Sequence, residues 1–147
     1  MSTSVRMAAF VLLLLGIAMG ALAVAFLADG SAYSGLRGIF AGVVVAVVAA
    51  IHAIAAFGLW RARVWATWLA LAIAVVGLAA AVLTGVGALN SGMSIAAPYY
   101  GQFQPWVDLR GLVLALVGGL GYAIVLWVVL ERIASAREKP GASGGES

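Results

Sequence analysis

Four long runs of apolar residues, none of them interrupted by a charged side chain, dominate this sequence. The hydrocarbon core of a bilayer is about 30 Å thick, and an α-helix crosses it with about 20 residues. Each of the four runs is long enough for such a crossing. We therefore expect four membrane-spanning helices, at about residues 7–27, 39–60, 64–89 and 112–130.

The balance of polar and apolar residues agrees with a membrane fold. Of the 147 residues, 65% are hydrophobic and only 9% are charged, whereas a soluble domain carries about 25% charged residues. The expected fold class is an all-α integral membrane protein, a four-helix transmembrane bundle with residues 1–139 in one membrane domain. Pro140 and the Gly- and Ser-rich stretch after it predict a disordered tail over residues 140–147.

The basic residues between the runs indicate the orientation, because Lys and Arg in short loops are retained on the cytoplasmic side. Six fall on one side of a four-span arrangement and two on the other. We expect consecutive helices to be antiparallel and both termini to be cytoplasmic. A composition rich in Ala, Gly and Val fits the bacterial inner (plasma) membrane. The six are Arg6, Arg61, Arg63, Arg132, Arg137 and Lys139, and the two are Arg37 and Arg110.

The N-terminus has a second interpretation. Arg6, the apolar stretch after it and Ala21-Leu22-Ala23 resemble a signal peptide with a small-residue cleavage site. The apolar run continues to Leu27, which is longer than a usual signal core and favours a retained helix. Cleavage would leave three spans, with the orientation of the rest unchanged.

Only Arg61, Ala62 and Arg63 separate the second run from the third, so these two helices are expected to form a tight hairpin. Three Trp residues lie near this turn, and indole rings prefer the headgroup level of a membrane. The turn and the start of the C-terminal tail thus provide expected cytoplasmic anchors. The Trp residues are Trp60, Trp65 and Trp68, and the basic anchors are Arg61, Arg63 and Arg132.

Small residues recur at helical spacing in every run. Because lipid tails are as apolar as leucine, membrane helices associate by close packing, which small residues permit. We expect most of these ladders to make contacts within the chain and the rest to serve a partner. The ladders are Gly16-Gly20-Ala23, Gly42-Ala46-Ala50, Gly77-Ala81-Gly85 and Ala115-Gly119-Ala123.

His52 is the single histidine of the chain and lies inside the second run, and an ionisable residue within a span is a candidate functional site. His52 lies eight residues inward from Trp60, the cytoplasmic end of the second run. The residue at the same distance from Leu130, the cytoplasmic end of the fourth run, is Tyr122. We therefore expect a hydrogen bond between these two residues, which would satisfy both polar groups in hydrocarbon. Three roles stay open: a structural pair, a proton relay, or a haem ligand with Met19 or a second protomer on the other axial position.

A second candidate site gathers the polar and aromatic residues of the two outer connections. These residues could bind a ligand, a lipid headgroup or a partner domain, although such residues more often anchor a protein in the interface. The outer-face cluster consists of Asp29, Tyr33, Arg37, Tyr99, Tyr100, Trp106, Asp108 and Arg110, with Asn90 beside it.

Several kinds of chemistry do not fit this composition. The chain has no cysteine and one histidine, which excludes disulfides, thiolate nucleophiles, Cys-ligated zinc or iron–sulfur clusters and a multi-His metal site within one chain. The basic residues stand singly or in pairs, so nucleic acid is not an expected partner. We expect no cofactor and no enzymatic activity.

The leading functional expectation is a small accessory or scaffold subunit of a larger membrane complex, or a self-associating bundle. Its partners would be the lipid bilayer and either another membrane protein or further copies of the chain. The alternative is a small-solute or proton-coupled transporter that acts as an oligomer around His52. No Asp, Glu or second His lies in any run to extend a proton path, which weakens the alternative.

Overall fold

The computed structural model describes residues 3–29, 36–94 and 109–137, all of which are helical apart from the turn at residues 61–63. Its four helices are α1 (Thr3–Asp29), α2 (Leu36–Trp60), α3 (Val64–Ser94) and α4 (Leu109–Arg137). All four are long and apolar enough to cross a membrane, as Thr3–Ala25, Ile39–Trp60, Val64–Leu89 and Gly111–Ala136. The expected all-helical class is confirmed for the described residues, with four helices that could each span a membrane.

The helices extend beyond the apolar runs at several ends. The helix α3 continues to Ser94, beyond the expected end of the third run at residue 89, and α4 begins at Leu109, before the expected start of the fourth run at residue 112. At the other end of α4 the helix continues through Arg137. Hydropathy marks where a helix leaves the hydrocarbon, whereas backbone hydrogen bonding decides where it ends. The expected tail over residues 140–147 lies outside the described residues.

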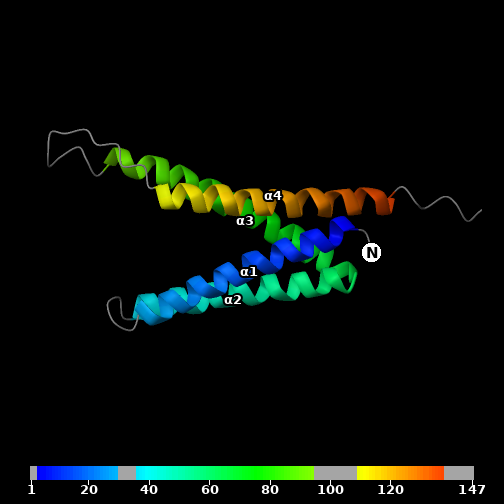
Figure 1. The fold of residues 1–147 in the computed structure, drawn as a ribbon, viewed down its shortest axis with the longest axis horizontal. Coiled ribbons are helices and arrows are strands. Elements are labelled where there is room, and N and C mark those ends of the chain that lie inside the picture. Colours follow the sequence, from blue (N-terminus) through cyan, green and yellow to red (C-terminus); the bar gives the residue numbers. More distant parts are fainter. Residues whose placement is uncertain (1–2, 30–35, 95–108, 138–147) are drawn as a thin grey trace, which may run out of the picture.

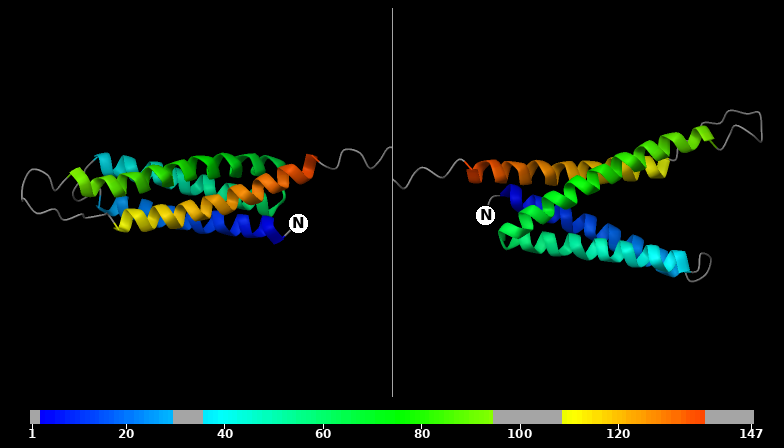
Figure 2. Two further views of the ribbon diagram at one scale, coloured as in Figure 1. Left: turned by 90° about the horizontal axis from the view of Figure 1, so that it is seen from above. Right: turned by 180° about the vertical axis from the view of Figure 1, so that it is seen from behind.

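The helices associate as two pairs, α1 with α2 and α3 with α4. The helices α1 and α2 lie side by side along most of their length, whereas α3 crosses α4 at an angle (Figures 1 and 2). The ladders expected in the third and fourth runs pack on one another. A Cβ built at Gly85 would lie 3.5 Å from the Cβ of Ala115, and one at Gly119 would lie 3.5 Å from the Cβ of Ala81. Both distances are ordinary van der Waals contacts, so small residues bring α3 and α4 together.

The first two ladders meet only in part. Gly42 lies against Leu27 and the carbonyl oxygen of Ala23, whereas a Cβ at Gly20 would have no neighbour within 4 Å. Ala46 and Ala50 are exposed. These two alanines therefore present accessible surface rather than a buried helix contact.

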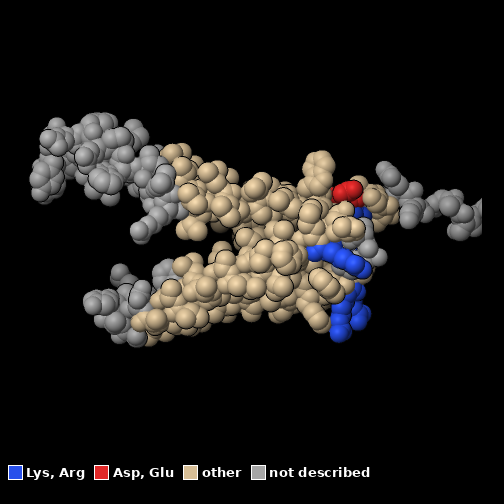
Figure 3. Space-filling model, in the orientation of Figure 1, with Lys and Arg blue, Asp and Glu red and all other residues tan. Residues whose placement is uncertain are grey.

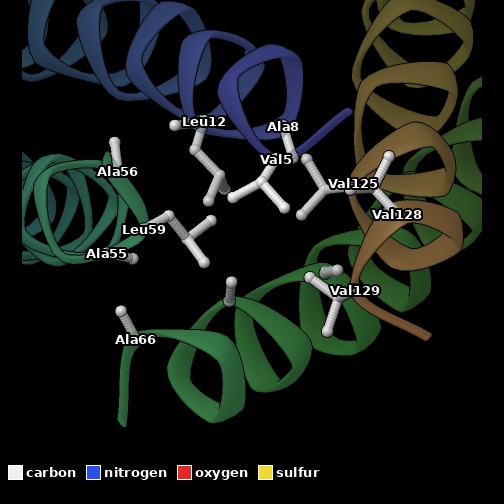
Figure 4. Packing of buried hydrophobic residues seen from close by; sticks show 13 residues of the cluster. Val5, Ala8, Leu12, Ala55, Ala56, Leu59, Ala66, Val125, Val128 and Val129 are labelled. Atoms are coloured by element: carbon white, nitrogen blue, oxygen red, sulfur yellow. The ribbon is translucent and has the colours of Figure 1, made fainter. Parts of the chain in front are cut away.

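One apolar core joins the two pairs at a single end of the molecule (Figure 4). It contains Leu12 from α1, Leu59 from α2, Ala66 from α3 and Val125 and Val129 from α4, all buried. The start of α1, the end of α2, the start of α3 and the end of α4 thus meet at this end, which we call the closed end. Here each helix contributes side chains to one cluster, so the four are held as a single unit.

Away from the closed end the two pairs diverge, and a wedge opens between them (Figures 1 and 3). Near the middle of α4, a Cβ built at Gly121 would lie 3.3 Å from the side chain of Leu15 in α1. Two turns further along the same faces, Leu22 is 45% exposed and Leu114 is 70% exposed. Gly118, one turn from Tyr122, has no neighbour within 4 Å of its Cβ position. The wedge is therefore lined by apolar or small residues.

Candidate functional site

His52 and Tyr122 join the two helix pairs about midway along the helices. The structure brings together the two residues that depth counting had paired: His52 Nε2 lies 3.0 Å from the hydroxyl oxygen of Tyr122. His52 Nδ1 lies 2.8 Å from the carbonyl oxygen of Val48, one turn earlier in α2. A carbonyl can only accept, so Nδ1 carries the proton and donates it to Val48. In a neutral imidazole Nε2 is then the acceptor, and the Tyr122 hydroxyl donates to it.

Both side chains of this pair are sealed from their surroundings. His52 is 3% exposed and Tyr122 is 5% exposed, and their rings are tilted by 58° with centroids 5.9 Å apart. A buried polar group without a partner is costly in hydrocarbon, and here both imidazole nitrogens have one. The pair acts as a polar cross-link between α2 of the first pair and α4 of the second.

Two glycines provide the space for this cross-link, one from each remaining helix. A Cβ at Gly16 of α1 would lie 3.1 Å from the Cβ of His52, so α1 approaches α2 closely at that level. A Cβ at Gly77 of α3 would lie 2.4 Å from ring atoms of Tyr122. That distance is too short for any real contact. All four helices therefore contribute one residue to a central layer, defined as Gly16, His52, Gly77 and Tyr122.

The central layer limits which chemistry His52 can perform. A metal or haem iron bound at Nε2 would have to displace the Tyr122 hydroxyl, and Nδ1 is already occupied by Val48. In the part of the chain that the structure describes, no three His, Cys, Asp or Glu side chains gather as a metal site would need. The arrangement as it stands positions a neutral imidazole and a phenol, and connects two helices.

The turn between α2 and α3 forms the second polar feature, at the closed end. The amide of Arg63 donates to the Gly58 carbonyl and that of Ala62 to the Leu59 carbonyl, each at 2.9 Å. These two bonds are the Schellman pattern, in which the residue at the position of Ala62 takes a left-handed conformation. Ala62 has a φ of 55°, a conformation usually taken by glycine.

The expected anchor residues surround this turn. The Arg61 guanidinium lies over the ring of Phe57, 4.6 Å from its centroid, and Arg132 of α4 donates from Nη2 to the Ala62 carbonyl at 3.4 Å. Arg63 is exposed. The indole rings expected at this level are also exposed, and belong to Trp60, Trp65 and Trp68.

The expected outer-face cluster falls largely beyond what the structure describes. Tyr33, Tyr99, Tyr100, Trp106 and Asp108 lie outside the described residues. The backbone of the remaining members is placed: Asp29 is the last residue of α1, and Arg37 and Arg110 are the second residues of α2 and α4.

Three residues shape these sites in ways that the sequence did not indicate. Gly77 was expected only as a packing residue, although it makes room for the Tyr122 ring. A Cβ at Gly58 would lie 2.5 Å from the Cβ of Ala66, so this glycine permits the tight turn. Arg132 was expected as an anchor in the headgroups, but its guanidinium also reaches across to the Ala62 carbonyl. Of these three features, only the role of Gly58 had a signal in the sequence, namely a glycine in the last helical turn before a three-residue connection.

Comparison with known proteins identifies no relative, so a functional assignment depends on the sites described above. No family model matches the chain, and neither do curated proteins or solved structures.

Proposed function

We propose that this chain is a multi-pass protein of the cell (inner or plasma) membrane, non-enzymatic, that serves as an accessory or scaffold subunit of a larger membrane complex or as a self-associating bundle. Consecutive helices would cross the bilayer in antiparallel fashion, with both termini cytoplasmic. Among the side chains that the structure describes, the basic and acidic ones gather at the closed end in the view of Figure 3, and six of the eight basic residues of the sequence belong to that side of a four-span arrangement. This distribution supports a cytoplasmic closed end.

The wedge is the observation that carries the proposal. Membrane helices associate through small residues that allow backbones to approach, and Gly118 on the wall of the wedge has open space in front of it. Leu114, on the preceding turn, and Leu22 of α1 add exposed apolar surface to the same walls. A helix of a partner subunit, or of a second copy, could pack closely against them.

The geometry of His52 supports a scaffold more than a carrier. Both of its nitrogens are engaged within the chain, at 2.8 and 3.0 Å. A relay residue must exchange protons with a path, and these bonds instead hold the imidazole in place. The His52–Tyr122 hydrogen bond would hold the α1–α2 pair and the α3–α4 pair in a fixed relative position, as a scaffold requires.

One observation favours the transport alternative. The His52–Tyr122 pair lies next to the bottom of the wedge, since Gly118 is only one turn from Tyr122 on α4 and faces open space. A solute that entered the wedge would lie within one helical turn of this buried polar pair. An oligomer could then enclose the wedge and make a site around His52.

The experiment is isolation of the tagged chain from its native membrane in mild detergent, followed by native mass spectrometry, with Gly118→Leu as the test variant. Gly20→Leu is the matched control. Gly20 also has no neighbour within 4 Å, but it lies two residues before Leu22 and thus faces nearly the opposite side of α1. Leucine at either position meets open space, so neither change should disturb the fold.

A foreign subunit or second copy that is present with the original chain and with Gly20→Leu, but lost with Gly118→Leu, supports the proposal. A lone monomer in all three preparations contradicts it. A small molecule retained by the original chain and lost on Tyr122→Phe would instead support the transport alternative.

A further inference from the structure

A polar pocket lies between the start of α1 and the last turns of α4, at the closed end. Its volume is about 240 Å³, which is room for several water-sized groups. It is lined by Ser4 and Val5 of α1 and by Val128, Glu131, Arg132 and Ser135 of α4. No residue of the central layer or of the wedge belongs to it.

Arg132 lines this pocket, and its guanidinium is only partly hydrogen-bonded. Its Nη2 donates to the Ala62 carbonyl, but its Nη1 is buried without a hydrogen-bond partner among the described residues. A buried nitrogen of a charged guanidinium without an acceptor is costly, and native proteins normally supply one. The guanidinium binds phosphate oxygens especially well because of its planar donor geometry. The cationic guanidinium therefore favours an anionic group in this pocket.

Glu131 lines the same pocket, so we expect the anionic group to be part of a ligand that also carries a positive charge. A bare phosphate would be repelled by this carboxylate, whereas a ligand with a positive group next to its phosphate would be attracted by both charges. Ser4 adds a hydroxyl, and it belongs to the first turn of α1, where backbone amides lack helical partners. Ser135 already donates its hydroxyl to the Glu131 carbonyl at 2.9 Å.

The position of the pocket selects the source of such a ligand. It lies at the end of the molecule where the rings of Trp60 and Trp65 are exposed, and indoles prefer the headgroup level. We propose that the pocket binds the phosphoethanolamine headgroup of a bilayer lipid. The Arg132 guanidinium and the Ser4 hydroxyl hold the phosphate, and Glu131 accepts hydrogen bonds from the primary ammonium. The inference requires only that the helices cross a bilayer, and is independent of the proposed scaffold role.

The test is native mass spectrometry of the purified full chain with phosphatidylethanolamine, phosphatidylglycerol and phosphatidylcholine of identical acyl chains. The original chain should retain phosphatidylethanolamine best. Phosphatidylglycerol has no ammonium for Glu131, and the quaternary ammonium of phosphatidylcholine has no N–H to donate. Arg132→Gln should weaken phosphatidylethanolamine binding at least about tenfold, the usual weight of one charge-assisted hydrogen bond. Glu131→Gln should reduce the preference over phosphatidylglycerol.

Arg61→Gln is the control, because Arg61 lies at the same end but outside the pocket. Because Arg132→Gln also removes the bond to Ala62, Ser4→Leu provides a second variant that fills the pocket and changes no charge. Loss of lipid with Ser4→Leu and not with Arg61→Gln supports the site. Equal retention of the three lipids, equal loss with Arg61→Gln, or displacement of the lipid by millimolar free phosphoethanolamine or inorganic phosphate overturns it.

Discussion

The ring of Tyr122 occupies the space that a side chain at Gly77 would need: a Cβ there would lie 2.4 Å from the Cε1 and Cζ atoms of the ring. Gly77→Ala should therefore push the ring away from His52 and destabilise the fold by about 1–3 kcal/mol, the usual effect of overpacking a core. Unfolding in detergent can be followed by the fluorescence of the five Trp residues.

Gly85→Ala is the matched control for this change. Its new Cβ would make an ordinary contact at 3.5 Å with Ala115, on the same helix pair. Alanine is also the better helix former by about 0.5–1 kcal/mol, so this variant should be as stable as the original or more so. Equal destabilisation by both changes would contradict the tight fit of Tyr122 on Gly77.

Tyr122→Phe tests the hydrogen bond to His52 directly. The change removes one hydroxyl and leaves His52 Nε2 without its donor, and we expect a loss of about 0.6–1.7 kcal/mol, the range measured for such bonds between membrane helices. Thr84→Val is the control: it also removes one hydroxyl, but the Thr84 hydroxyl is exposed and donates only to Ala80 in its own helix. If Tyr122→Phe proves as harmless as Thr84→Val, the cross-link between the pairs does not contribute to stability.

The tautomer of His52 gives a spectroscopic prediction. The Nδ1 atom should carry the proton, because it faces the Val48 carbonyl at 2.8 Å, and Nε2 should be unprotonated and hydrogen-bonded. The chain has a single histidine, so its ¹⁵N resonances need no assignment. In Tyr122→Phe the Nε2 resonance should move and the Nδ1 resonance should change little. A proton found on Nε2 would rule out the arrangement described here.

Ala62→Gly should stabilise the chain by about 1 kcal/mol, because Ala62 has a φ of 55° and glycine takes that conformation without the steric cost of a Cβ. Ala62→Val should do the opposite, since a β-branched side chain tolerates positive φ least. Thermal unfolding of the two variants side by side checks the sign of each effect. Equal stability of the Ala62→Gly and Ala62→Val variants would exclude a left-handed conformation at position 62.

Engineered cysteines can test both the contact between α3 and α4 and the opening of the wedge, since the chain has no cysteine of its own. Ala81→Cys with Gly119→Cys should form a disulfide on mild oxidation, because the Cβ separation of 3.5 Å falls within the range of natural disulfides. Leu22→Cys with Leu114→Cys, on opposite walls of the wedge, should keep free thiols. Maleimide labelling and mass spectrometry count the thiols that remain. Rapid bridging of the second pair would mean that the wedge is closed in solution.

The sequence was most informative where simple distances decide the outcome. Uninterrupted apolar runs predict the helices, because a helix is the structure that satisfies its own backbone in lipid. The juxtaposition of His52 and Tyr122 followed from depth alone, since every helix rises by the same amount per residue. Neither result needed knowledge of how the helices cross.

What depends on the crossing angles could not be predicted in this way. The contact of Gly77 with Tyr122 and the exposure of Gly118 follow from small rotations of each helix, which are set by the packing of all neighbours together. The ladders show the same limit: Gly85 and Gly119 meet α-helical partners, while Gly20 does not, although the spacing in the sequence is alike. The bond from Arg132 to Ala62 joins residues that are 70 positions apart and had no sequence signal.

The divergence of the two helix pairs has a mechanical consequence for a bilayer that contains this protein. A shape that is narrow at the closed end and broad at the other occupies a smaller cross-sectional area in one leaflet than in its counterpart. In a bilayer that the four helices cross, lateral pressure in each leaflet should act on the angle between the pairs. We therefore expect membrane curvature and the protein's shape to be coupled through the central layer of Gly16, His52, Gly77 and Tyr122. Reconstitution into vesicles of different diameter would show this as a preference for one curvature, and Tyr122→Phe should weaken that preference.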